Sequence, residues 1–143
     1  MPTLRSIRRN DASQSGVVWD YQVGQLVPAP TANLCVKIAE RDNPQHRAAL
    51  ARLQLEHAEA IRAGGDRRVE AWAKIQTRAL AEAVLLGWWN LDDDDGSPLI
   101  YSPDAAEKLL ADPSLWPFRH FVEDAAGIVR GYVAEQEAAA TGN

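Results

Sequence analysis

Four consecutive aspartates, Asp92 to Asp95, followed by Gly96 are the residues of this chain that most invite a metal-binding interpretation. Carboxylate oxygens are the ligands that Ca²⁺ prefers, and an EF-hand loop carries a glycine at its sixth position. Placing Gly96 sixth requires an oxygen ligand at Leu91 and a glutamate at Ser102, and neither residue fits. We therefore interpret the run as a solvated turn and predict no metal site.

Histidine and cysteine could support zinc or nucleophilic chemistry, but their positions do not favour it. None of the three histidines, His46, His57 and His120, forms the i, i+4 pair of a helical zinc site. Cys35 is the single cysteine, so an intramolecular disulfide is excluded. No set of nucleophile, base and oxyanion donors can be assembled from the sequence. We predict no catalytic residue and no cofactor, and we expect a protein that is not an enzyme.

Tryptophan is the residue type that stands out, with five in 143 residues and an adjacent pair at Trp88 and Trp89. Two adjacent indoles that leave a helix cannot easily face the same way. One should enter the core, and the other is a candidate contact surface, since Trp is enriched at binding hot spots. Alternatively, both stack within the domain against the last helix. The candidate partner-binding residues are Trp88, Trp89, Tyr101, Trp116, Phe118 and Phe121.

Charge and hydropathy limit the classes of partner. The chain has 15 basic and 20 acidic residues and a formal charge of −5, which argues against binding to a phosphate backbone. We interpret a small basic cluster, Arg5, Arg8 and Arg9, as a solvated face. No stretch approaches the roughly 18 apolar residues that span a bilayer, and the first residues lack the apolar core of a signal peptide. We expect a cytoplasmic protein with neither nucleic acid nor membrane as partner.

The elements that must position these residues change in type along the chain. Residues 17–21 and 34–38 are rich in β-branched and apolar side chains and predict strands, and Leu4 and Ile7 indicate a weaker one. Strands this short must pair and pack on helices.

Helix signals follow the strands. Asn43 and Pro44 are suited to the N-cap and first position of a helix that ends at Gly64–Gly65. Asp66 is expected to cap the next helix, whose apolar residues continue to Leu86 before Gly87 breaks it.

Two further helices are predicted towards the carboxyl terminus. Ser102 is expected to cap a short helix, and Asp112–Pro113 restarts the chain. Residues 118–132 form the cleanest amphipathic stretch. The tail from Gln136 has nothing to bury and should fray.

Together these signals predict one α+β domain, mostly α, over residues 1–143, with short amino-terminal β-strands packed on a bundle of about four helices. Its parts are a β-rich segment over 1–40, a helical segment over 43–135 and a frayed tail over 136–143. A chain of this length can bury about 70% of its unfolded surface without a disulfide or metal.

The segment from Ala79 to Val133 resembles the tail assembly chaperones of long-tailed bacteriophages. The resemblance lies in the order of short motifs: a helix into a Leu-x-Gly-Trp turn, an acidic stretch ending in Gly, a Tyr-Ser-Pro-acidic motif, a Leu-Leu-x-Asp-Pro segment and an aromatic helix. Here these are Leu85 to Trp88, Asp92 to Gly96, Pro98 to Asp104, Leu109 to Pro113 and Phe118 to Tyr132. Upstream, Lys37 to Ala39 followed by Asn43–Pro44 is similar to the family's entry from strand to helix.

The resemblance implies a function without bond chemistry. Such chaperones coat the tape measure protein, keep its apolar surface soluble and help to recruit tail tube subunits before they leave the particle. A programmed frameshift often appends a second domain in that family, and self-association is a further expectation. The implied location is the host cell cytoplasm, with no copies in the mature virion. Apolar helix stripes wider than a small core needs could receive a partner helix in a groove.

Two alternatives stay open at this point. The first is a structural virion protein, such as a head–tail connector or tail completion subunit, which would remain in the particle. The second is a host-directed regulator that binds DNA through the amino-terminal arginines.

Overall fold

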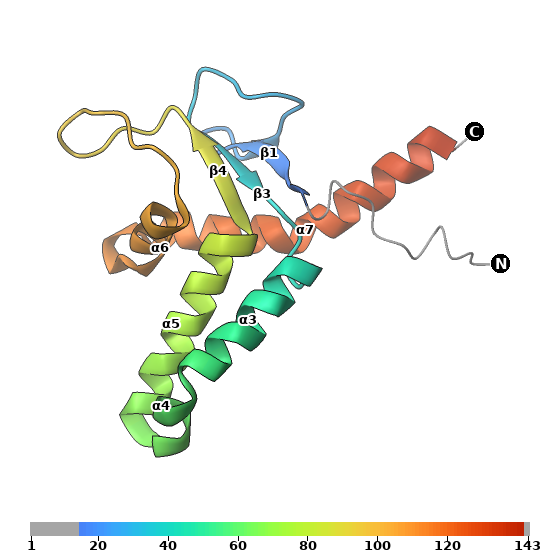
Figure 1. Cartoon of the computed structure of the whole chain (residues 1–143). Coiled ribbons are helices and arrows are strands. Elements are labelled where there is room, and N and C mark those ends of the chain that lie inside the picture. Colours follow the sequence, from blue (N-terminus) through green and yellow to red (C-terminus); the bar gives the residue numbers. More distant parts are fainter. Residues whose placement is uncertain (1–14, 142–143) are drawn as a thin grey trace.

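The computed structural model describes the backbone of residues 15–141 and the side chains of residues 15–129. Leu4 and Ile7, assigned above to a weak strand, lie outside the described residues, as do Arg5, Arg8 and Arg9. Within the described part, helices pack against a small antiparallel sheet (Figure 1). This architecture confirms the prediction of a mostly helical α+β fold.

The sheet contains four strands in the order β2-β1-β3-β4, and all neighbours are antiparallel. The strands are β1 (Val17–Asp20), β2 (Gln25–Leu26), β3 (Cys35–Ile38) and β4 (Leu85–Trp89). The predicted strands over 17–21 and 34–38 are thus confirmed as β1 and β3. Trp19 pairs with Val36, which pairs with Trp88 on its other side, so one buried row of side chains crosses three strands.

The fourth strand corrects the predicted end of the second helix. The apolar spacing placed Leu86 in that helix and its break at Gly87, but helix α5 (Gly65–Ala83) ends earlier and β4 begins at Leu85. Leu85 pairs with Ile38, and Trp88 with Val36, with an irregular register near Leu86. Both side chains are buried there, so pairing with a distant strand outweighs the local helical pattern.

The first two helices of the described chain form a hairpin with α5. They are α3 (Pro44–Glu56) and α4 (Ala58–Ala63), so the single predicted helix is interrupted at His57. Figure 1 shows this hairpin projecting away from the sheet with α4 at its tip. A separate small core holds it together, made of Ala49, Leu53, Ile75 and Ala79.

The N-cap residues of α3 and α5 test two of the predictions. The Asn43 side chain accepts a hydrogen bond of 2.9 Å from the backbone N–H of His46, which confirms it as the N-cap of α3. Asp66 does not cap α5, because the N-cap position is Gly64, with a φ of 70°. Such a φ favours glycine, and it moves the helix start ahead of Asp66, which lies in the first turn.

The remaining helices are α6 (Pro103–Ala111), the short 3₁₀ turn η1 (Pro113–Leu115) and α7 (Trp116–Thr141). Ser102 accepts a hydrogen bond of 3.0 Å from Ala105 N–H, which confirms this cap. The backbone of α7 is helical through Thr141, past the point at which the tail was expected to fray.

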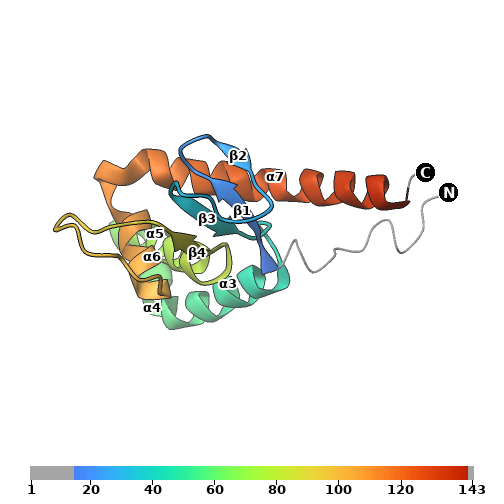
Figure 2. The same ribbon diagram turned by 90° about the horizontal axis from the view of Figure 1, so that it is seen from above.

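The long helix α7 runs along one face of the sheet, and its carboxyl-terminal part extends beyond the sheet (Figure 2). Its aromatic residues meet those of the first strand region: the ring centroids of Trp19 and Phe121 are 5.9 Å apart, and those of Tyr21 and Phe121 5.0 Å apart. The main core therefore lies between the sheet, α7, α6 and the carboxyl-terminal end of α5.

Candidate functional site

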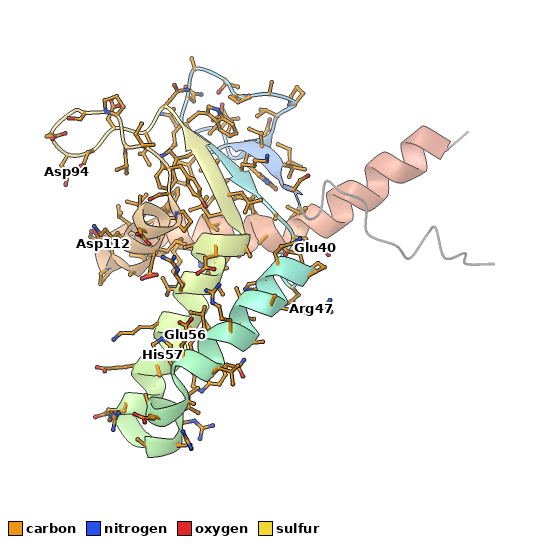
Figure 3. The ribbon with its side chains drawn as sticks, in the orientation of Figure 1. Glu40, Arg47, Glu56, His57, Asp94 and Asp112 are labelled. Carbon is orange, nitrogen blue, oxygen red and sulfur yellow. The ribbon has the colours of Figure 1, made fainter. Side chains whose placement is uncertain are left out.

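The acidic run that invited a calcium interpretation is a solvated turn, as predicted. Asp92 to Asp95 are exposed, and Asp93 N–H donates to the Ser97 carbonyl at 2.7 Å. Figure 3 shows Asp94 in the loop that projects from the sheet, away from the helices. Among the described residues, no group of three or more His, Cys, Asp or Glu could hold a metal ion.

The adjacent tryptophans point to opposite faces of the sheet. Trp88 is 8% exposed, its Nε1 donates to the Leu99 carbonyl at 2.7 Å, and its ring meets Tyr101 edge-on at 5.0 Å. Trp89 is 36% exposed. Of this pair, Trp88 is thus a core residue, and Trp89 remains available for contacts.

The other aromatic candidates are mostly structural. The Tyr101 hydroxyl lies 2.7 Å from the Leu85 carbonyl, and burial raises the pKa of this phenol. Phe118 is buried, and Phe121 packs on Tyr21. Trp116, at the start of α7, is 67% exposed. Only Trp89 and Trp116 of the six candidates therefore present a large exposed surface.

A groove between the helices is a second candidate site. A groove of about 330 Å³ opens between the α3–α5 hairpin and α7. We call it the hairpin groove. Its lining residues come from α3, α5, α7 and the segment before α3: Arg41, His46, Leu50, Gln54, Trp72, Gln76, Leu80, Arg119 and Glu123.

The floor of the hairpin groove is apolar. Leu80 is buried, and Leu50 and Trp72 are half-buried against the small core of the hairpin. A half-buried indole in a groove presents a large rigid apolar face to a ligand at little entropic cost. The floor can therefore take an apolar side chain.

One wall of the groove contains His46, which is 6% exposed. Its Nδ1 accepts a hydrogen bond of 3.0 Å from the backbone N–H of Asp42, so the neutral ring carries its proton on Nε2. Burial lowers the pKa of His46, and the positive charge of Arg41 lowers it further, while the carboxylate of Asp42 opposes both. His46 is thus a neutral donor at the groove.

The opposite wall is built by Arg119 of α7. Its Nε donates to Glu123 at 2.8 Å, and its terminal nitrogen donates to Thr77 of α5 at 2.8 Å and to the Leu110 carbonyl at 3.2 Å. This guanidinium ties α7 to α5 and α6, so the width of the groove depends on a fixed set of hydrogen bonds.

The groove has two features that suit the recognition of a ligand. Its floor is apolar, and hydrogen-bond donors surround that floor. The sequence indicated helix stripes wide enough to receive a partner helix, but it did not bring Trp72 and the other lining residues together in one groove. The available signal was the width of the stripes on residues 50–61 and 69–86, which exceeds what a two-helix contact buries. Among the described helices, none is both long and apolar enough to cross a membrane.

Comparison with known proteins adds the family. A model of the family described as YdaY prophage protein matches residues 41–143, a segment that includes every residue lining the hairpin groove. This match defines a protein of phage origin. The chain belongs to the YdaY prophage protein family. No curated protein and no solved structure matches it significantly.

Proposed function

We propose that this protein is a tail assembly chaperone that binds the tape measure protein and helps to recruit tail tube subunits during tail morphogenesis. It acts in the host cytoplasm, performs no bond chemistry and leaves before the virion matures. Three observations support the proposal: the prophage family, the order of motifs between Ala79 and Val133, and the hairpin groove. The groove is the observation that carries it.

The groove suits a helical partner. Recognition of an amphipathic helix uses a hydrophobic groove between helices, into which a few apolar side chains insert as anchors. Here α3, α5 and α7 supply the walls, and Trp72 supplies a floor residue of the type enriched at binding hot spots. A tape measure helix held in this way has part of its apolar stripe covered. The net charge of −5 helps to keep neighbouring complexes apart.

Recruitment of tube subunits uses the other end of the molecule. A frameshifted carboxyl-terminal extension would continue from α7, whose end extends beyond the sheet (Figure 2). The extension would then be displaced from the sheet along the helix axis, which leaves room for a second partner.

Co-expression with the tape measure protein from the neighbouring gene tests the proposal. We expect the tape measure protein to become soluble and to co-purify with this chain. Trp72→Ala should reduce the co-purified amount, whereas Trp116→Ala, which removes an indole outside the groove, should not. Circular dichroism of both variants verifies that each is folded. A tape measure protein that stays insoluble and unbound beside the folded wild-type chain would contradict the proposal.

The composition of purified phage particles provides a second test of the proposal. A head–tail connector or tail completion subunit remains in the virion as a ring of defined copy number. Mass spectrometry of purified particles should therefore find no copies of this chain. A constant copy number per particle would replace the chaperone by a structural virion protein.

A further inference from the structure

The charged groups of the hairpin groove are paired unequally. Glu123 is the one carboxylate among the lining residues, and it is held 2.8 Å from Arg119. This pair is close to neutral as a unit. The second guanidinium, that of Arg41, is exposed and has no hydrogen bond or ion pair among the described residues. Among residues 15–129, whose side chains are described, the Arg41 guanidinium is thus a cation at the groove without an ion-pair partner.

Arg41 is held in place by its backbone. Its N–H donates to the carbonyl of Ala126 in α7 at 3.2 Å, which fixes the base of the side chain between the hairpin and α7. The next residue in the chain, Asp42, has a side chain that is 72% exposed and lies outside the groove lining. Water therefore screens Asp42 more strongly than it would a carboxylate bound within the groove.

The neutral polar groups at the groove include further donors. His46 presents Nε2–H, because its Nδ1 accepts from Asp42 N–H. Gln54 and Gln76 are exposed amides on α3 and α5. A ligand with acceptor oxygens therefore meets more partners here than a ligand with donors only.

We propose that the hairpin groove selects a protein segment that presents a carboxylate side chain next to an apolar one. The apolar side chain lies on Trp72, Leu50 and Leu80, and the carboxylate accepts hydrogen bonds from the Arg41 guanidinium. A helix supplies both groups on one face when they are three or four residues apart. The identity of the partner as the tape measure protein rests on the proposed function, but the chemistry of selection does not.

Model peptides test the selection without the tape measure protein. The probes are acetylated, alanine-rich helical peptides with one Leu and one Glu spaced one helical turn apart, and matched peptides with Gln or Lys in place of Glu. Titration into isotope-labelled protein is followed by the Trp72 indole N–H resonance. We expect the Glu peptide to shift this resonance and to bind about fivefold more tightly than the Gln peptide, with the Lys peptide weaker still.

Reversal of the charge at Arg41 provides a second, more specific test of the inference. Because Arg41 is exposed, Arg41→Glu should leave the fold intact and make the Lys peptide bind more tightly than the Glu peptide. Arg62→Glu, at the tip of the hairpin, is the matched control and should leave the preference unchanged. Equal binding of the three peptides to the wild type, no response of Trp72, or the same effect from Arg62→Glu would overturn the inference.

Co-expression separates this inference from the proposed function. If the peptides show no preference while the tape measure protein co-purifies equally with wild type and Arg41→Glu, the selection by the groove is wrong while the chaperone proposal stands. If it binds neither, while the peptides show the expected preference, the chaperone proposal fails and the selection stands.

Discussion

The Asn43 side-chain amide donates a hydrogen bond of 2.9 Å to the carbonyl of Ala83, and so joins the start of α3 to the last residue of α5. The same Nδ2 donates to the Glu40 carbonyl at 2.7 Å, while Oδ1 caps α3 through His46 N–H. Asn43 is 4% exposed. Because β4 begins at Leu85, this one buried side chain also sets the hairpin relative to the sheet.

Asn43→Asp should destabilise the fold strongly. The aspartate keeps an oxygen to cap α3, but it turns a second oxygen towards two carbonyls that had received hydrogen bonds. We expect a loss of about 3 kcal/mol in the free energy of unfolding, measured by urea denaturation. Asn90 offers a matched control, because its exposed Nδ2 also donates to two carbonyls, those of Thr31 and Asn33. Water can replace those bonds, so Asn90→Asp should cost less, and equal losses would contradict the explanation.

Stability should depend on the charge of His46. Burial lowers its pKa below the ordinary value of 6.5, so the unfolded chain binds this proton at a higher pH than the folded chain does. The free energy of unfolding should therefore fall as the pH drops below 6.5, until the folded-state pKa is reached. Urea midpoints between pH 7 and about pH 5.5 measure this slope. His46→Gln should flatten it, and an unchanged slope in the variant would refute the assignment.

The tryptophans should separate into structural and surface residues. Trp88→Phe removes the donor to the Leu99 carbonyl and part of a buried ring, so we expect a loss of about 2 kcal/mol. Trp116→Ala, at 67% exposure, should change the free energy of unfolding by less than about 0.5 kcal/mol. Thermal unfolding of the two variants provides the comparison. A large loss for Trp116→Ala would reveal packing that its exposure does not indicate.

Arg78 of α5 contacts three carboxylates, of which Asp104 and Glu107 connect it to α6. Its guanidinium lies 2.6 Å from Glu82, 2.7 Å from Asp104 and 3.3 Å from Glu107, and Arg52 of α3 also lies 2.6 Å from Glu82. Hydrogen bonds to Asp104 and Glu82 raise the pKa of Arg78, and hydrogen bonds from Arg52 and Arg78 lower the pKa of Glu82. The guanidinium is therefore charged throughout the normal pH range.

Arg78→Lys should lose stability although the charge is kept. A lysine ammonium cannot reproduce the planar fork that reaches several carboxylates, and we expect a cost of about 1 kcal/mol at low salt. The side chain is 29% exposed, so part of that difference should disappear at about 1 M salt. Urea unfolding at both salt concentrations measures it, with Arg62→Lys as the control. A cost that is independent of salt would point to packing of the side chain instead.

Local signals in the sequence were sufficient for the elements that depend on near neighbours. Asn43 and Ser102 cap helices because each side chain reaches an N–H three residues ahead, and the sequence alone specifies that spacing. Residues 17–21 and 34–38 were recognised as strands from their side chains. The acidic run at Asp92 was recognised as a solvated turn, because adjacent like charges disfavour burial.

Tertiary contacts decided the rest. Leu85 and Leu86 continue the apolar pattern of the preceding helix, and only pairing with β3 makes residues 85–89 a strand. The hairpin groove cannot be located from any one segment, since α3, α5 and α7 each contribute residues and Arg119 sets the positions of the helices through contacts with Thr77 and Leu110. The sequence thus determined the caps at Asn43 and Ser102, the acidic turn, the composition and the resemblance to phage proteins, because these depend on residues close together in the chain. The surface that a partner would meet depends on which distant helices pack side by side, and that was decided by the buried contacts of the folded chain.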